Sequence, residues 1–185
     1  SESADGLIYY PFYASFAVPV VMLFTNDQRP HAGQVSVLFI ETMATTGALY
    51  TITAGAIDRS RPLVYNENLP DNKRREASAQ RSFFAGHTAA TASATFFAAK
   101  IFNDFNPDSR ARPYVWAAAA LVPAWVGYLR LDSGKHFLTD NVVGYAIGAA
   151  SGILIPELHK KENKSLSLFP TMGRDYQGLS MHYSF

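Results

Sequence analysis

Two stretches rich in small residues decide the fold of this chain: AATASATFFAA at residues 89–99 and VVGYAIGAASG at residues 142–152. Alanine, glycine and serine side chains let two helices approach closely, so both stretches are predicted to be packed helices. Around them, apolar segments alternate with polar connections, and we expect helices at roughly 10–25, 34–57, 87–103, 113–128 and 137–160. The prediction is an all-α fold, an antiparallel bundle of about five to seven helices.

Composition excludes several classes of protein. The 185 residues suit one domain, and 48% of them are hydrophobic, so disorder is not expected for the chain as a whole. The formal net charge is +1, whereas a dedicated nucleic-acid-binding protein carries a strong basic excess. No cysteine is present, so neither a disulfide framework nor thiolate chemistry contributes.

One segment, Val35 to Ile57, is long enough to cross a bilayer. It contains Glu41 and many threonine, glycine and alanine residues, so we interpret it as a buried helix rather than a lipid-facing one. The apolar stretch from Pro11 to Phe24 is short for a span. On these lengths we favour a soluble or surface-associated protein over an integral membrane protein.

The chain changes character after Lys164. The segments SLSLF at 165–169 and LSMHYSF at 179–185 alternate polar and apolar residues, and Gly173 to Gly178 lies between them. Alternation of this kind predicts two strands joined in a hairpin. Because an isolated hairpin is only marginally stable, we expect the tail, 165–185, to pack on the helical domain formed by residues 1–164.

Polar residues that a bundle does not require gather in three short segments: DRSRP at 58–62, FAGHT at 84–88 and RLDSGKHFLTD at 130–140. Each segment lies at the end of a predicted helix. An antiparallel bundle can therefore bring all three segments to one mouth.

These segments supply groups that bind phosphate. Arginine presents a planar fork of donors that matches phosphate oxygens, so Arg61 and Arg130 are candidates to clamp one phosphate between them. Gly86 opens a predicted helix, where backbone N–H groups and the helix dipole attract an anion. The three segments therefore predict a phosphate site.

Two histidines add reactive groups to this predicted site. His87 and His136 supply a nucleophile and an acid, and Asp140 lies four residues after His136, on the same face if the segment is helical. A carboxylate in that place can hold the imidazole in the tautomer whose other nitrogen attacks. The set is typical of phosphoryl transfer through a covalent phosphohistidine, with arginines stabilising the spread charge.

The order and spacing of the segments resemble the acid phosphatase–haloperoxidase superfamily, which includes the type-2 phosphatidic acid phosphatases. That family carries Lys-x6-Arg-Pro, Pro-Ser-Gly-His and Ser-Arg-x5-His-x3-Asp, in this order. Here the third motif is Leu129-Arg130-x5-His136-x3-Asp140, the second is Phe84-Ala85-Gly86-His87, and the first keeps Arg61-Pro62. The resemblance covers about residues 50 to 155, and the third motif is its most specific part.

The resemblance implies a role for each of these residues. His136 would attack phosphorus, Asp140 would orient it, and His87 would protonate the leaving oxygen. The family works without a metal or other cofactor, so the expected activity is metal-independent hydrolysis of a phosphomonoester or diphosphate, with a lipid as the favoured substrate. The expected location is periplasmic or membrane-associated. The residues expected to bind phosphate are Arg61, Arg130 and Gly86.

Three positions depart from the family motifs. The family's lysine falls on Ala54, the serine of the second motif is Ala85, and the serine before Arg130 is Leu129. Loss of one donor to a developing charge lowers a rate by about two to three orders of magnitude. Candidates to replace the missing lysine are Arg59, Lys73 and Lys135.

Three alternatives stay open on the sequence alone. Ala54 and Ala85 suit a weakened relative that binds phosphate or lipid headgroups without turnover. A vanadate-dependent haloperoxidase would use the same anion site, although the chain is short for one. A zinc site built from His87, His136 and Asp140 is disfavoured, because two nearby arginines would repel the cation.

Overall fold

The structure, a computed structural model, describes residues 2–160, 166–172 and 177–183. Within these residues, seven α-helices and two strands are joined by loops and three short 3-10 helices, η1 to η3. The bounds are α1 Glu2–Leu7, α2 Tyr9–Met22, η1 Arg29–His31, α3 Ala32–Ala56, η2 Pro62–Tyr65, α4 Asp71–Arg74, η3 Ala77–Gln80, α5 Gly86–Phe105, α6 Arg112–Asp132, α7 Leu138–Leu158, β1 Leu166–Met172 and β2 Gln177–Tyr183.

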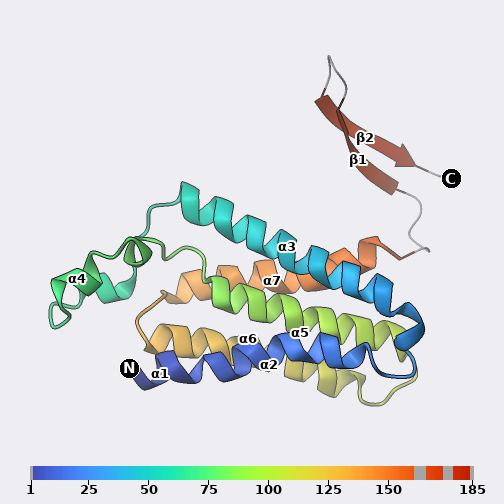
Figure 1. The fold of residues 1–185 in the computed structure, drawn as a ribbon, viewed down its shortest axis with the longest axis horizontal. Coiled ribbons are helices and arrows are strands. Elements are labelled where there is room, and N and C mark those ends of the chain that lie inside the picture. Colours follow the sequence, from blue (N-terminus) through green and yellow to red (C-terminus); the bar gives the residue numbers. More distant parts are fainter. Residues whose placement is uncertain (1, 161–165, 173–176, 184–185) are drawn as a thin grey trace.

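Helix α5 forms the centre of an antiparallel bundle (Figure 1). It packs most extensively on α7 and α6 and also contacts α2 and α3. Nearly every residue from Thr88 to Ile101 is buried. The predicted all-α bundle is therefore confirmed, and the two small-residue stretches lie in α5 and α7, the pair with the largest contact.

Small residues explain why α5 and α7 lie so close together. A Cβ atom at Gly148 would collide with the carbonyl group of Ala89 on α5, so only glycine fits this crossing. The hydroxyl oxygens of Thr46 and Ser93 are 2.6 Å apart and join α3 to α5 inside the bundle. Close backbone approach and interhelical hydroxyl contacts are typical of helices that pack in a membrane.

Helix α3 is largely exposed, so the prediction of a buried helix is wrong. Val37, Ile40 and Ile52 are 63%, 66% and 69% exposed. The threonines that suggested a buried helix satisfy their hydroxyls locally; for example, Thr42 Oγ1 donates to the Leu38 carbonyl over 2.8 Å. A hydroxyl bonded within its own helix needs neither water nor a protein partner, and it is therefore compatible with a lipid-facing helix.

Three helical segments are long and apolar enough to cross a membrane: Arg29–Ala56, Arg112–Asp132 and Leu138–Leu158. Large apolar side chains on α6 and α7, such as Leu121, Trp125 and Leu158, are also exposed. Exposed apolar surface spread over several helices of spanning length is typical of contact with lipid. The protein is therefore membrane-associated. The preference for a soluble or surface-associated protein rested on a buried helix at Val35 to Ile57, and that helix is largely exposed.

The predicted C-terminal hairpin is present. Strands β1 and β2 pair antiparallel, with Leu166 opposite Tyr183 and Met172 opposite Gln177. The connecting residues 161–165 lie outside the described residues. The division into domains at residue 164 and the packing of the hairpin on the bundle therefore stay predictions.

Candidate active site

The three polar segments meet at one end of the bundle, where α6 ends and α5 and α7 begin (Figure 1). Backbone hydrogen bonds join them: the Leu63 N–H donates to the Gly134 carbonyl, and the Ala85 N–H donates to the Asp140 carbonyl, both over 3.0 Å. Gly134 has a φ of 67°, which glycine adopts without strain, and its turn leads from α6 into α7. The structure thus brings together segments that the sequence placed at separate helix ends.

His136 lies in the turn before α7 and is 1% exposed. Its Nδ1 is 2.7 Å from the backbone carbonyl oxygen of Ser82. Because a carbonyl oxygen only accepts hydrogen bonds, we assign the proton to Nδ1 and the lone pair to Nε2. This is the tautomer in which Nε2 can act as a nucleophile.

Asp140 holds the segment around His136 without a hydrogen bond to the imidazole. Its Oδ2 accepts hydrogen bonds from the Ser82 hydroxyl at 2.6 Å and from the Phe137 N–H at 2.9 Å. The same oxygen is 4.0 Å from His136 Nδ1, which is too long for a hydrogen bond. Helix α7 begins only at Leu138, so His136 lies before the helix, and the Asp140 carboxylate caps the start of α7.

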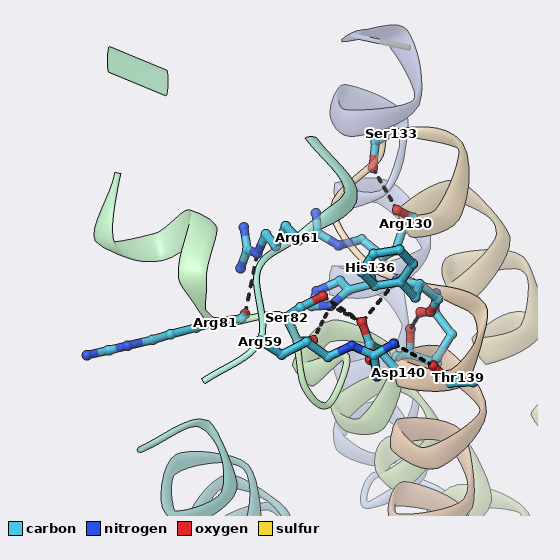
Figure 2. A network of polar contacts seen from close by, with 12 residues as sticks. Arg59, Arg61, Arg81, Ser82, Arg130, Ser133, His136, Thr139 and Asp140 are labelled. Atoms are coloured by element: carbon cyan, nitrogen blue, oxygen red, sulfur yellow. Dashed lines mark hydrogen bonds and ion pairs between the residues drawn. The ribbon is translucent and has the colours of Figure 1, made fainter. Parts of the chain in front are cut away.

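Arg61 and Arg130 both lie near His136 (Figure 2). Arg130 is 5% exposed, and its Nη1 is 3.2 Å from Asp5 Oδ1. The Lys135 Nζ is 3.3 Å from the other carboxylate oxygen of Asp5. Asp5, Arg61 and Lys135 line a polar cavity of about 580 Å³. The predicted phosphate-binding arginines therefore belong to a group of cations gathered around a carboxylate of α1.

The arginines also affect the charge of both histidines. Burial, followed by the positive charges of Arg130 and Arg61, lowers the pKa of His136 to about 3. The same causes, in the same order, lower the pKa of His87 in the first turn of α5 to about 4. Both imidazoles are therefore neutral near pH 7, and all four side chains form one electrostatic cluster.

Gly86 and His87 border a second cavity, which is mainly apolar. A Cβ atom on Gly86 would lie 2.9 Å from the Tyr50 ring, so the glycine lets α3 approach the start of α5. The His87 and Phe12 rings have centroids 4.8 Å apart. The cavity is about 260 Å³, and its lining from α2 and α3 includes Phe12, Met43 and Tyr50. His87 therefore has an apolar space beside it that is open to a ligand.

The three candidates for the missing lysine fall into two groups. Lys73 and Lys135 line the polar cavity together with Arg61. Arg59 points elsewhere: its Nη1 lies 2.7 Å from Asp140 Oδ1 (Figure 2). Of the three candidates, the two lysines are therefore the ones that lie, with Arg61, at the polar cavity.

The zinc alternative finds no support in the geometry. Within the part of the chain that the structure describes, no three His, Asp or Glu side chains are arranged to hold a metal ion. The carboxylate of Asp140, one of the three ligands considered, is engaged by Arg59, by Ser82 and by the Phe137 N–H.

Comparison with known proteins identifies the family. The sequence model of the PAP2 superfamily matches residues 36–164, more than half of the chain. The chain belongs to the PAP2 superfamily, as its motifs predicted. A search of curated proteins found no match. Among solved structures, the chain is similar to "the first transmembrane PAP2 type phosphatidylglycerolphosphate phosphatase from Bacillus subtilis", with a TM-score of 0.63 and 22% identity. That similarity covers 86% of this chain and 78% of the other, and it confirms the fold.

Two residues of the site were missed by sequence reasoning. Ser82, which accepts the His136 Nδ1–H, lies just before the FAGHT segment and contributes a backbone carbonyl, which no side-chain motif encodes. Asp5 is separated from Arg130 by 125 positions, so no local pattern connects them. Ala4 and Ile8 pack on Val126 and Leu129 of α6, which places Asp5 beside Arg130, and these two apolar residues were the available signal that the start of the chain packs there.

Proposed function

We propose that this protein is a metal-independent phosphatase that hydrolyses a phosphomonoester or diphosphate of a lipid through a phosphohistidine at His136. The observation that carries the proposal is the buried His136 imidazole, held by Ser82 in the tautomer with a free Nε2 and surrounded by the charges of Arg61 and Arg130. A neutral nucleophile beside two permanent cations suits attack on an anionic phosphate group. Membership of the PAP2 superfamily supports a phosphatase.

The proposed reaction has two steps. Nε2 of His136 attacks phosphorus, the bond from phosphorus to the leaving oxygen breaks, and that oxygen takes a proton from His87. Water then attacks the phosphohistidine with His87 as the base, which releases phosphate and restores neutral His136. The positive charge of the phosphorylated imidazole is stabilised by its Nδ1–H bond to the Ser82 carbonyl. Arg61 and Arg130 neutralise the charge on the equatorial oxygens.

The apolar cavity beside His87 supports a lipid substrate. His87 protonates the leaving oxygen in this proposal, so the leaving group extends from phosphorus toward His87. Phe12, Met43 and Tyr50 line the cavity on that side, and they come from helices α2 and α3 of a membrane-associated bundle. An apolar leaving group there would exchange water for apolar contacts.

A substrate panel with purified protein in detergent micelles tests the proposal. We expect metal-independent release of phosphate from phosphatidate, phosphatidylglycerophosphate or a prenyl diphosphate, with kcat/KM at least about tenfold above that for a soluble aryl phosphate. Met43→Trp, which fills the apolar cavity, should lower kcat/KM for the lipid and leave the aryl phosphate little changed. No phosphate release from any lipid or soluble ester between pH 4 and 9 would contradict the proposal.

The pH dependence follows from the two lowered pKa values. His136 must be neutral to attack, and with a pKa of about 3 it is mostly neutral above pH 3. His87 must be protonated to donate, and with a pKa of about 4 in the free protein it is mostly protonated only below pH 4. We therefore expect kcat/KM, after correction for ionisation of the substrate, to be highest under acidic conditions and to fall as the pH rises. In the pH profile of kcat, the fall should occur at a higher pH than in kcat/KM. The bound phosphate offsets the arginine charges that lower the His87 pKa. A kcat/KM that rises with pH through 6.5 would contradict these assignments.

Binding without turnover is the second candidate function, and it is favoured by the two alanines. Ala54 lies in the last turn of α3, and Ala85 is fully buried beside Gly86, so neither supplies the donor that the family motif has there. Vanadate or phosphate binding measured by calorimetry, together with zero turnover in the substrate panel, would identify this function. Restoring both donors, in Ala54→Lys with Ala85→Ser, would then raise phosphate release.

A further inference from the structure

The N–H, the hydroxyl and the carbonyl of Ser82 each make a hydrogen bond. Its N–H donates to the Arg59 carbonyl over 2.8 Å, and its hydroxyl donates to Asp140 Oδ2 over 2.6 Å. Its own carbonyl oxygen accepts the Nδ1–H of His136 at 2.7 Å. The side chain is fully buried. Because the three bonds join Ser82 to Arg59, Asp140 and His136, a shift of Ser82 is expected to change the position of the imidazole.

Asp140 depends on Arg59 for compensation of its charge. The carboxylate is 0% exposed, and Oδ2 accepts both of its hydrogen bonds. Among the described residues, Oδ1 has no hydrogen bond of good geometry, but it lies 2.7 Å from Arg59 Nη1 in an ion pair. Removing one partner of a buried ion pair leaves an uncompensated charge, which the structure relieves by moving or by taking up a proton.

The guanidinium of Arg59 is itself fixed in this orientation. Its Nη2 donates to Thr139 Oγ1 over 3.1 Å, and its Cζ lies 4.8 Å from the centre of the Phe137 ring. Arg59 is absent from the lining of the polar cavity, to which Arg61 contributes. Figure 2 shows the Arg59 side chain running toward Asp140 and Thr139, whereas Arg61 extends along a separate path.

From this arrangement we propose that Arg59 is a positioning residue for the nucleophile, acting on His136 through Asp140 and Ser82. Arg59 fixes Ser82 in two ways. The Arg59 carbonyl accepts the Ser82 N–H, and the Arg59 guanidinium pairs with the Asp140 carboxylate that accepts the Ser82 hydroxyl. It thereby sets both the tautomer and the direction of the His136 ring. The proposal rests on the proposed function for the role of His136, and it excludes Arg59 as the substitute for the family's lysine.

Kinetics and ligand binding separate positioning from phosphate binding. We expect Arg59→Met to lower kcat by about 100-fold, the cost of a nucleophile displaced by about 1 Å, while KM and the Kd for vanadate change little. Arg59→Lys keeps a positive charge near Asp140 and should recover part of kcat. Ser82→Ala should lower kcat in the same way, and its effect should not add to that of Arg59→Met, because both act on one network.

The matched control is Arg81→Met. Arg81 is an exposed arginine of the adjoining segment, and its side chain points away from His136 in Figure 2. The substitution should leave kcat and vanadate binding unchanged. Arg61→Met provides the opposite comparison, because loss of a phosphate-binding arginine should weaken vanadate binding together with kcat.

A readout independent of turnover is the ¹⁵N spectrum of His136 in histidine-labelled protein, assigned by comparison with His136→Gln. We expect Nδ1 to be protonated in the parent protein, and we expect Arg59→Met and Ser82→Ala to give a mixture of tautomers. If Arg59→Met fails to fold, Arg59→Lys and Ser82→Ala carry the same test.

The possible outcomes are distinct. Loss of vanadate binding in Arg59→Met, matching that in Arg61→Met, would make Arg59 a phosphate ligand and overturn the proposal. An unchanged kcat and an unchanged His136 spectrum in the variant would also overturn it. If the parent protein hydrolyses no phosphate ester, the proposed function fails, and the ¹⁵N spectra and vanadate titrations still decide whether Arg59 positions His136.

Discussion

His136→Gln is expected to lower phosphate release by about 10⁴-fold or more, because a group that forms the covalent intermediate has no substitute in the site. Glutamine keeps a donor that can reach the Ser82 carbonyl, so the buried position stays satisfied without a nucleophile. The matched control is His159→Gln. His159 follows α7 at the opposite end of the bundle, 3.6 Å from Glu41, and the substitution should leave the rate unchanged.

The intermediate itself gives the decisive measurement. Rapid quenching during hydrolysis of a ³²P-labelled substrate should leave label on the parent protein, in a bond that is stable to base and labile to acid, and none on His136→Gln. His87→Gln should behave differently, because an aryl leaving group needs little protonation. That variant should lose far more activity on an alkyl or lipid phosphate than on an aryl phosphate. Labelling of His136→Gln at the level of the parent protein would place the nucleophile elsewhere.

Residue periodicity and small-residue content predicted the bundle well, because these features determine how helices pack. The predicted helix at 137–160 corresponds to α7, Leu138–Leu158, and the one at 87–103 corresponds to α5, Gly86–Phe105. The error over α3 had a physical cause. Threonine and glycine suggest a protein interior in water, but in a lipid-facing helix the same threonines bond to their own backbone, as Thr42 does.

The side chains of the site were predicted from the sequence, whereas backbone acceptors and contacts between residues far apart in the chain were not. Arg61, Arg130 and His136 were found because their residue types and spacing are distinctive. The acceptor for the His136 Nδ1–H is a main-chain carbonyl, and the Asp140 carboxylate, which the spacing placed near the imidazole, lies 4.0 Å from Nδ1. Arg59 was considered only as a cation for phosphate, since the sequence does not reveal which carboxylate lies beside it.

Arg130→Met is expected to have the next largest effect, a loss of about two to three orders of magnitude in kcat/KM. Arg130 is almost fully buried, and within the described residues its Nε has no hydrogen-bond partner. A buried donor without an acceptor is a donor available to a bound anion. Methionine preserves the packing of the aliphatic stem and removes the charge, so the loss should appear in both vanadate Kd and kcat.

Before substrate binds, Arg130 is paired with Asp5. Its carboxylate is 3.2 Å from Arg130 and 3.3 Å from Lys135, so a phosphate that binds these cations competes with it. Asp5→Asn should therefore tighten vanadate binding in the parent background, where Arg130 is released from its partner, and should do much less in Arg130→Met. If both backgrounds respond equally, Asp5 does not compete at Arg130. If Arg130→Met binds vanadate as the parent does, Arg130 is not a phosphate ligand, and the cations of the polar cavity, Arg61, Lys73 and Lys135, must bind the phosphate without it.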